Sequence, residues 1–268
     1  MTLVWRPGYG GVPGKVVLLK ESQPLDADAE AYVNAVEVAD GQRIEDPVRF
    51  AINNFVIGCK ADGIWNAIKA SCILAGARTL AGALVPLKGA APTNVGGLFV
   101  QADYNRKTGL VGDGSTKYLN SNRNNNADPQ NSFHLATYAS TIGTTGYAIA
   151  AGGSETGTSM LGLFFNVQRS RTGLAFNNAG GAAGFNGHSR SASGSYTHRA
   201  ASTNTTLTAT SETPANLSLL VFARGTAASP ASLSNARLAF YSIGESLNLA
   251  LLDARVTALI NAIGAAIP

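Results

Sequence analysis

The feature that most constrains the fold is a series of short apolar runs, separated by turn residues, that begins near Pro92. Each run spans about four to seven residues, and neighbouring runs are about ten to twenty residues apart, which is typical of an antiparallel sandwich. The runs lie at residues 96–100, 132–138, 146–150, 161–167, 173–176, 195–198, 217–222 and 237–241. Because no helical pattern separates them, a parallel α/β sheet is disfavoured. The sequence predicts a mainly β chain, with polar surface loops at residues 120–126 and 177–194.

The last run passes directly from a strand pattern into a helix pattern. Leu238, Phe240 and the region of Ile243 alternate with period two, as in a strand with one face on a core. Gly244 turns the chain, and Ser246 is the expected N-cap. Helical spacing follows at Leu252, Val256, Leu259, Ile260 and Ile263. This stripe must be buried against the chain's own sheet or against a partner chain, and we expect the helix to end at Gly264.

The first 91 residues divide into two parts. Residues 1–45 are interrupted early by glycine and proline and predict an extended arm, in which residues 16–19 form one strand. That strand joins another subunit's sheet or is the first strand of the main domain. Residues 46–91 predict a helical hairpin and linker, with one helix from Asp46-Pro47 to Gly58 and a second from about Asp62 to about Ala75. Residues 92–268 then form the β-sandwich domain with its C-terminal helix.

Charge is sparse and unevenly distributed. Charged residues make up 13% of the chain, about half the usual fraction. Residues 1–88 contain nine Lys or Arg and nine Asp or Glu, whereas residues 89–268 contain eleven and seven, so the net charge of +4 belongs to the second part. Nine of those eleven cations are Arg, which suits bidentate contacts to acidic groups, although scattered surface charge explains the same counts. No compact basic run with interleaved aromatic residues occurs, so nucleic-acid binding is not expected.

Cysteine content and the lengths of the apolar runs indicate the cellular compartment in which the protein is expected. Cys59 and Cys72 are the only cysteines, and they belong to no metal-ligand or redox motif, so buried free thiols are expected. No secretory leader pattern opens the chain, and no apolar run approaches the roughly 18–20 residues of a membrane span. We expect a soluble protein that is made in a cytoplasm and does not insert into membranes, and that can still leave the cell inside a particle.

Three segments, in their order and separation, resemble a known family. They are residues 53–65 (NNFVIGCKADGIW), 110–119 (LVGDGSTKYL) and 238–247 (LAFYSIGESL). Together they look like segments of the concanavalin A-like (laminin-G-like) jelly-roll virion proteins of tailed bacteriophages, and the likeness spans residues 46–263. The resemblance implies a two-sheet jelly roll in a virion structural protein, such as a short fibre, spike or head decoration, assembled in the bacterial host cytoplasm. Residues 1–45 match no family pattern.

Catalysis and metal binding are not expected. Glycosidases on this fold need two carboxylates facing each other across a cleft, but Glu155, Glu212 and Glu245 stand alone in the sequence. The three histidines lack the spacing of a zinc pair and do not suggest a catalytic triad. The residues that would have to converge on a lectin-type Ca²⁺ are Asp103, Asn105, Asp113 and Asn120. Since Asp113-Gly114 is first of all a tight-turn dipeptide, we predict no catalytic residue, no metal and no cofactor.

A sugar-binding surface is the remaining site hypothesis. The candidate glycan-binding residues are Tyr118, Asn120, Asn122, Arg123 and Asn124, at one strand end and its loop. An aromatic face packs on the apolar side of a sugar ring, and amide and guanidinium groups bind its hydroxyls. The alternative is that Tyr118 packs in the sandwich and the asparagines occupy turns.

Assembly is the function that the resemblance favours. The candidate residues for oligomer formation or particle docking are Val16, Leu18, Phe55, Trp65 and Ile68. The apolar face of residues 46–75, with Trp65 at its centre, packs on the sandwich or between protomers. Because this face exceeds what one small hairpin can hide, we expect a homo-oligomer, with a trimer favoured. Other virion proteins and host surface polysaccharide are the further partners that the resemblance implies. The alternatives are a free carbohydrate-binding lectin module and, third, a glycoside hydrolase on the same fold.

Overall fold

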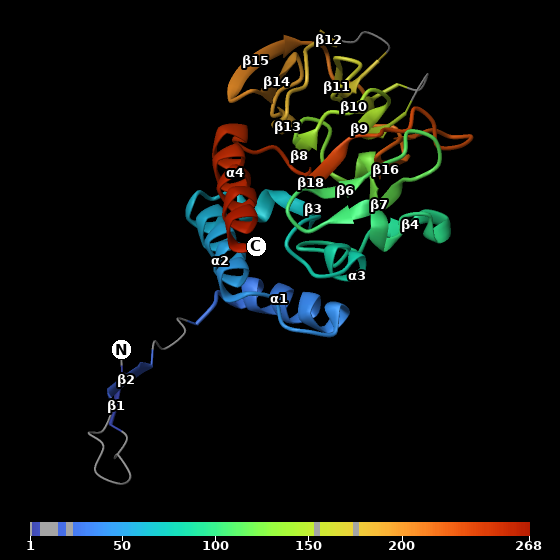
Figure 1. Ribbon diagram of the computed structural model, residues 1–268. Coiled ribbons are helices and arrows are strands. Elements are labelled where there is room, and N and C mark those ends of the chain that lie inside the picture. The colour runs from blue at the N-terminus through green and yellow to red at the C-terminus, as the bar shows by residue number, and fades with distance from the viewer. Residues whose placement is uncertain (1, 6–15, 20–23, 153–155, 174–176) are drawn as a thin grey trace.

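The structure is a computed structural model that describes residues 2–5, 16–19, 24–152, 156–173 and 177–268. Two large antiparallel sheets form its body (Figure 1). The first, called the β9 sheet, has the order β12 (Asn177–Asn178), β11 (Val167–Thr172), β10 (Thr158–Gly162), β9 (Tyr147–Ala151), β16 (Ser218–Val221), β7 (Leu119–Asn124) and β4 (Thr93–Asn94). The short β17 (Arg224–Gly225) pairs with β9 in parallel.

The second sheet, called the β18 sheet, carries the helices. Its order is β15 (Thr203–Thr208), β14 (Ser195–Ala200), β13 (Gly184–Arg190), β8 (Phe133–Thr141), β18 (Arg237–Gly244), β6 (Gly109–Val111) and β5 (Tyr104–Asn105), and β3 (Ile68–Ile73) also pairs with β18. Shorter elements connect the strands: α3 (Leu80–Ala83) and the 3-10 segments η1 (Trp65–Ala67), η2 (Val95–Gly97), η3 (Gln101–Asp103) and η4 (Asn125–Ala127).

The space between the two sheets is apolar in one part and polar in another. Phe133 and Leu135 of β8 are fully buried in the same core as Ile149 of the β9 sheet. Toward β13 and β14, polar side chains bridge the sheets instead. The Tyr196 hydroxyl donates to the Gln168 carbonyl at 2.8 Å. This hydroxyl is tolerated in the interior because it is hydrogen-bonded.

Helices α2 (Asp46–Ala61) and α4 (Leu249–Ala266) pack side by side on the outer face of the β18 sheet (Figure 1). The rings of Phe55 in α2 and Phe240 in β18 are 5.8 Å apart. Gly58 leaves room for the Arg255 side chain of α4, since a Cβ there would lie 2.7 Å from the Arg255 Nε. Arg255 then pairs with Asp62, just beyond α2, at 2.7 Å.

By length and composition alone, α4 could cross a membrane. In this structure its predicted stripe is buried, from Leu252 to Ile263. Asp253 of α4 also pairs with Arg199 of β14 at 2.8 Å. Asn248, not Ser246, caps the helix, because its Oδ1 accepts from the backbone N–H of Ala250 at 2.9 Å. These contacts are those of a helix that covers a sheet.

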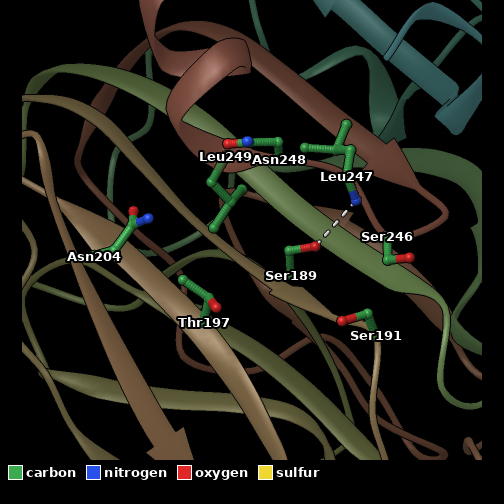
Figure 2. A pocket seen from close by; sticks show the side chains of 8 residues that line it. All are labelled: Ser189, Ser191, Thr197, Asn204, Ser246, Leu247, Asn248 and Leu249. Carbon is green, nitrogen blue, oxygen red and sulfur yellow. Dashed lines mark hydrogen bonds between the residues drawn. The ribbon is translucent and has the colours of Figure 1, made fainter. Parts of the chain in front are cut away.

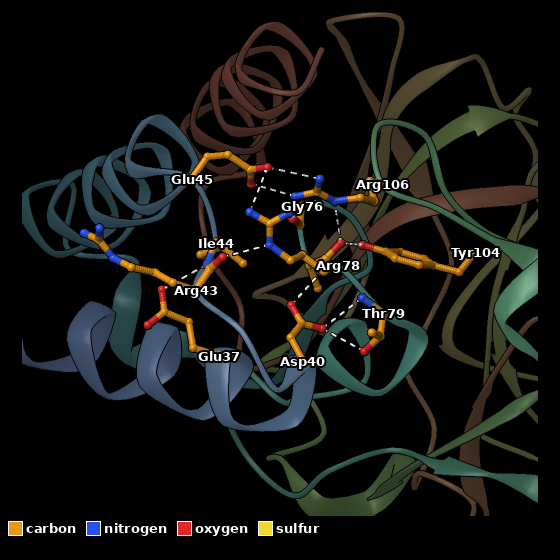
Figure 3. Close-up of polar contacts among 11 residues, drawn as sticks. Glu37, Asp40, Arg43, Ile44, Glu45, Gly76, Arg78, Thr79, Tyr104 and Arg106 are labelled. Atoms are coloured by element: carbon orange, nitrogen blue, oxygen red, sulfur yellow. Dashed lines mark hydrogen bonds and ion pairs between the residues drawn. The ribbon is translucent and has the colours of Figure 1, made fainter.

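A further helix, α1 (Ala27–Asp40), is held to the body by a polar cluster (Figure 3). The Asp40 carboxylate accepts from the backbone N–H of Arg78 at 2.7 Å and from both the backbone N–H and the hydroxyl of Thr79, at 2.8 and 2.7 Å. Beside it, Arg106 binds Glu45 through both terminal nitrogens, at 3.1 and 2.6 Å. Hydrogen bonds from Arg106 lower the pKa of Glu45. The cluster ties the helices to the loop after β3.

Replacement of Asp40 by Ala is expected to lower the free energy of unfolding by about 2–3 kcal/mol, because three partly buried donors lose a buried, charged acceptor. Urea unfolding followed by circular dichroism measures the change. Glu30→Ala, at an exposed acid of the same helix, is the matched control and should change stability by less than about 0.5 kcal/mol. Equal effects of the two substitutions would contradict a latching role for Asp40.

The predicted mainly β class with a C-terminal helix is confirmed, but the helical hairpin is wrong in its second half. Residues 62–75 contain η1 and β3, and β3 pairs with β18, with Ile73 opposite Phe240. A short apolar run of this kind fits a helix and a buried strand equally well, and pairing with β18 decides the outcome. Gly58 does not end α2, which continues to Ala61.

The extended arm expected over residues 1–45 is wrong for residues 27–40, which form α1. Four of its residues recur at helical spacing and are buried: Ala29, Tyr32, Val33 and Val36. Asp26 caps the helix and Gly41, with a φ of 67°, ends it. Before α1, β1 (Thr2–Trp5) and β2 (Val16–Leu19) pair with each other in a separate two-stranded sheet, which Figure 1 shows apart from the larger sheets.

Several strand boundaries also differ from the predictions. The run at 96–100 includes the end of η2 and forms no strand, and the run at 161–167 is divided between β10 and β11 by a turn that exposes Phe164 and Phe165. The predicted loops at 120–126 and 177–194 contain β7 and β13. Both strands are rich in polar residues, so they lack the apolar alternation on which the prediction depended. Residues 174–176 of another predicted strand lie outside the described residues.

Candidate functional site

A hollow of about 340 Å³ lies beside the N-terminus of α4 (Figure 2). We call it the α4 pocket. It is lined by Ser189, Ser191, Thr197, Asn204, Ser246, Leu247, Asn248 and Leu249. Six of these eight side chains carry a hydroxyl or an amide, and none is charged. The lining is therefore polar and neutral.

Strand register brings the polar side chains of the α4 pocket together. Ser189 of β13 lies opposite Thr197 of β14, and Arg199 of β14 lies opposite Asn204 of β15. His188 and Arg190 flank Ser189 and contact Tyr196 inside the sandwich, so alternation turns Ser189 to the outer face. The pocket is thus built on rigid strands.

The segment between β18 and α4 closes another side of the pocket. The backbone N–H of Leu247 donates to the Ser189 hydroxyl at 3.1 Å, which Figure 2 marks with a dashed line. The backbone N–H of Ser246 donates to the Ser132 hydroxyl, also at 3.1 Å. Leu249 is buried behind them. These bonds hold residues 246–249 against the sheet.

The structure places the five predicted sugar-binding residues on or just before β7, where they make contacts within the chain. Tyr118 is partly buried against the core, as the alternative interpretation required. Asn120 accepts from the backbone N–H of Asn122 at 2.9 Å. The Asn122 amide donates to the Ala91 carbonyl at 2.7 Å. Asn122 has a φ of 55°, which asparagine tolerates better than most residues.

Arg123 and Asn124, the other two predicted sugar-binding residues, also make hydrogen bonds within the chain. The Arg123 Nε donates to the Asp128 carboxylate at 3.0 Å, and Asp128 is 5% exposed. The Asn124 amide donates to Asn216 at 2.8 Å. The segment therefore has structural roles, and sugar binding by its side chains stays a prediction.

The predicted docking residues of the helical region are buried within the chain itself. Phe55, Trp65 and Ile68 are 2%, 6% and 0% exposed, so their assignment to an exposed docking surface is wrong. The Trp65 Nε1 donates to Asp28 at 3.1 Å, and the Lys88 ammonium lies 4.5 Å from the ring centroid. The apolar face of residues 46–75 is covered because it packs against the β18 sheet and α4 of the same chain.

Val16 and Leu18, the remaining docking candidates, lie in β2. They are paired with Trp5 and Leu3 of β1. The alternative that residues 16–19 form the first strand of the main domain does not hold, since β2 pairs with β1 and not with a described strand of the two large sheets. A role in docking stays a prediction.

The acidic residues weighed for catalysis or Ca²⁺ have local partners. Asp113 accepts from the backbone N–H groups of Ser115 and Thr116 at 2.9 and 2.8 Å, as in the expected turn. Burial raises the pKa of Asp113, but these and neighbouring hydrogen bonds outweigh it and hold the pKa well below the usual value. Asp103 pairs with Lys117 at 2.7 Å.

The three glutamates considered for glycoside hydrolysis are placed differently. Glu245 pairs with Lys69 at 3.0 Å, and Glu212 accepts from the backbone N–H of Gly157 at 2.9 Å. Glu155 lies outside the described residues. In the part of the chain that the structure describes, no group of three or more His, Cys, Asp or Glu side chains is arranged to hold a metal ion.

All three histidines and both cysteines are buried. Burial lowers the pKa of His134 to about 4 and lowers the pKa values of His188 and His198. His134 donates through Nδ1 to the Glu245 carbonyl at 2.6 Å, which leaves Nε2 to accept from the Ser242 hydroxyl at 2.8 Å. Burial also raises the pKa of the Cys59 and Cys72 thiols to about 12, as expected for unreactive structural cysteines.

Sequence reasoning missed the α4 pocket. Ser189 and Ser191 fall in the segment that was predicted to be a loop, and Asn204 was assigned to no element. Serine, threonine and asparagine on a strand face have no periodic signal that distinguishes them from turn residues. The predicted N-cap of α4, Ser246, stands two residues before the observed N-cap, Asn248, and both residues line the pocket.

No protein-family model matches the sequence, and no curated protein matches it significantly.

Proposed function

We propose that this chain is a structural protein of a tailed-bacteriophage virion, a surface appendage or decoration with a jelly-roll sandwich, assembled in the bacterial cytoplasm. The sequence resemblance of residues 46–263 motivates the proposal. The observation that carries it is the separate β1–β2 sheet ahead of a body in which polar contacts fasten α1, α2 and α4. A stable body with an independent terminal strand pair suits attachment to a larger assembly.

Strand addition is the attachment mode that the terminal sheet supports. Val4 pairs with Val17, and among the described strands the pair has no neighbour on its outer edges. An unpaired strand edge presents N–H and C=O groups that another chain can complete. Attachment through β1–β2 is therefore the proposed function of the N-terminal segment.

Homo-oligomer formation, with a trimer favoured, remains part of the proposal but moves to other residues. Phe50 and Ile57 are 38% and 46% exposed and lie seven residues apart on α2, which places them on one helix face. Val38 of α1 is 83% exposed. These three residues replace Phe55, Trp65 and Ile68 as the candidate oligomer contacts.

Cosedimentation tests the virion role. Particles are purified from a lysate of the source bacterium after phage induction, and the chain is located by immunogold labelling and mass spectrometry. We expect the chain to sediment with intact particles at a fixed copy number. A chain that stays in the particle-free fraction would favour the free lectin module, which the α4 pocket supports as the second candidate.

Val17→Pro tests attachment through the terminal sheet. Proline removes a backbone donor and disfavours the β1–β2 pairing, so a tagged Val17→Pro copy supplied in trans is expected to enter particles at least about tenfold less than wild type, the equivalent of about 1.4 kcal/mol. Val17→Thr keeps the backbone donor and is the matched control. Unchanged melting temperatures would show that the body is intact in both variants, and equal incorporation of both would contradict the attachment mode.

A further inference from the structure

We propose that the α4 pocket binds a neutral saccharide. Its polar side chains retain hydrogen-bonding capacity that the chain does not use. Within the described residues, the hydroxyls of Ser191 and Thr197 have no hydrogen-bond partner, and the Ser189 hydroxyl accepts one bond, which leaves its hydrogen free to donate. Hydroxyl groups both donate and accept, as the hydroxyls of a sugar do.

Two side-chain amides add further unused hydrogen-bond donors to the α4 pocket. The Asn204 Oδ1 accepts from Arg199 at 2.9 Å, so its position is fixed and its NH₂ group is left to donate. The Asn248 Oδ1 accepts from the first turn of α4, which likewise leaves its NH₂ group. Figure 2 shows Asn204 and Thr197 on one side of the pocket and Ser191 and Ser246 on the other. Polar groups therefore surround the space from two sides.

The charge distribution favours a neutral ligand over an anion. None of the lining side chains is charged. The nearby Arg199 guanidinium is neutralised by Asp253 at 2.8 Å, and the Asp253 side chain is only 9% exposed. Although a helix N-terminus attracts anions, the Asn248 side chain already occupies the first N–H groups of α4. An acidic sugar or a phosphate would find no free cation here.

The volume and the apolar lining of the α4 pocket also suit a saccharide. Leu247 is half-buried and Leu249 is buried, and both line the pocket. Leu247 offers apolar surface to the C–H face of a sugar ring, and Leu249 supports it from behind, while the hydroxyl and amide groups face the ring's oxygens. A volume of about 340 Å³ lies at the lower end of the range for ligand sites, which suits a mono- or disaccharide unit.

This inference is independent of the virion role, because binding in solution tests the pocket and cosedimentation tests the role. The probe is the purified full-length chain on an array of neutral plant and bacterial oligosaccharides, with sialylated, sulfated and phosphorylated glycans as the anionic arm. The best neutral glycan is then titrated calorimetrically. We expect binding to neutral glycans only.

Substitutions at three exposed or half-exposed positions test whether the saccharide binds in the α4 pocket. Thr197→Val keeps shape but removes one hydroxyl and is expected to weaken binding about fivefold, the loss of one neutral hydrogen bond. Ser191→Trp should fill the pocket and abolish binding. Thr208→Val, an exposed threonine of β15 outside the pocket, is the matched control and should bind as wild type.

Other outcomes overturn the proposal. Among these are no neutral glycan bound on the array, a preference for anionic glycans, and wild-type affinity of Ser191→Trp. A loss of binding in Asn124→Ala without a loss in Ser191→Trp would place the sugar on β7 instead. Near-ultraviolet circular dichroism and melting temperatures confirm that each variant is folded before its affinity is compared.

Discussion

Replacement of Arg190 by Met is expected to lower the free energy of unfolding by about 3–5 kcal/mol. The Arg190 side chain is fully buried between the sheets. Its Nε donates to the Ser170 carbonyl at 2.6 Å, and its terminal nitrogens donate to four carbonyls, of Ala192, Ser193, Ser195 and Ala209, at 2.9 to 3.2 Å. Methionine fills a similar volume but leaves all five acceptors without this donor.

Two further variants separate the donors from the charge. Arg190→Lys keeps the charge but replaces the planar fork with a single ammonium, so it should recover less than half of the loss. Arg43→Met makes the same substitution at a side chain that is 61% exposed, where the expected change is within about 1 kcal/mol. Urea unfolding measures all three. A change of under about 1 kcal/mol in Arg190→Met would show that the carbonyls find other donors.

Arg190 also shows why part of the sandwich could not be predicted. The runs at 132–138, 146–150 and 237–241 are confirmed as β8, β9 and β18 because their side chains are apolar and buried, which is what a period-two pattern detects. β13, in contrast, reads Gly-Phe-Asn-Gly-His-Ser-Arg and is nonetheless almost entirely buried. Its inward side chains are polar. The Arg190 guanidinium among them is satisfied by carbonyls outside β13, and such partners are invisible in a local pattern.

Two features of the helices that cover the β18 sheet could be predicted from the sequence. Pro47 at the start of α2 and the stripe of α4 are both confirmed. The error at residues 62–75 arose because β3 has its partner, β18, more than 160 residues away in the chain, and a long-range pairing overrides a local helical spacing. The helical spacing of Ala29, Tyr32, Val33 and Val36 indicates α1, but the glycines and prolines early in the chain favour an extended arm.

The candidate site was not predictable, for a different reason. The sequence predicts a sugar site at Tyr118 because an aromatic residue and three asparagines stand close together there. The α4 pocket instead gathers Ser189, Thr197, Asn204 and Asn248 from four separate elements. Their proximity depends on the register of β13, β14 and β15 and on where α4 begins. Only the assembled sheet brings those small polar side chains together.

The protein is expected to lose stability between pH 7 and pH 5, by about 2 kcal/mol for His134, whose pKa burial lowers to about 4, and by a further amount for His188 and for His198. His134, His188 and His198 are buried, and burial is the first cause of their lowered pKa values. In the unfolded chain each histidine binds a proton below about pH 6.5. Because burial lowers the pKa values in the folded state, the unfolded state binds more protons in this range, and stability falls as the pH falls.

Urea unfolding at pH 7, 6 and 5 measures this loss, and His188→Leu isolates one contribution. His188 is flanked by the rings of Phe133 and Tyr196, at 6.2 and 5.7 Å, and the charges that lower its pKa further come from His198 and Arg190. Leucine cannot titrate, so the slope of stability against pH should fall by about 1.4 kcal/mol per pH unit below pH 6. The carboxylates with lowered pKa values, such as Asp26 and Glu45, release their stabilisation only near pH 4 and below, so they do not contribute in this window. A stability that is constant between pH 7 and pH 5 would mean that the histidines reach water or gain new acceptors when protonated, and that the polar part of the core is less tightly closed than its hydrogen bonds imply.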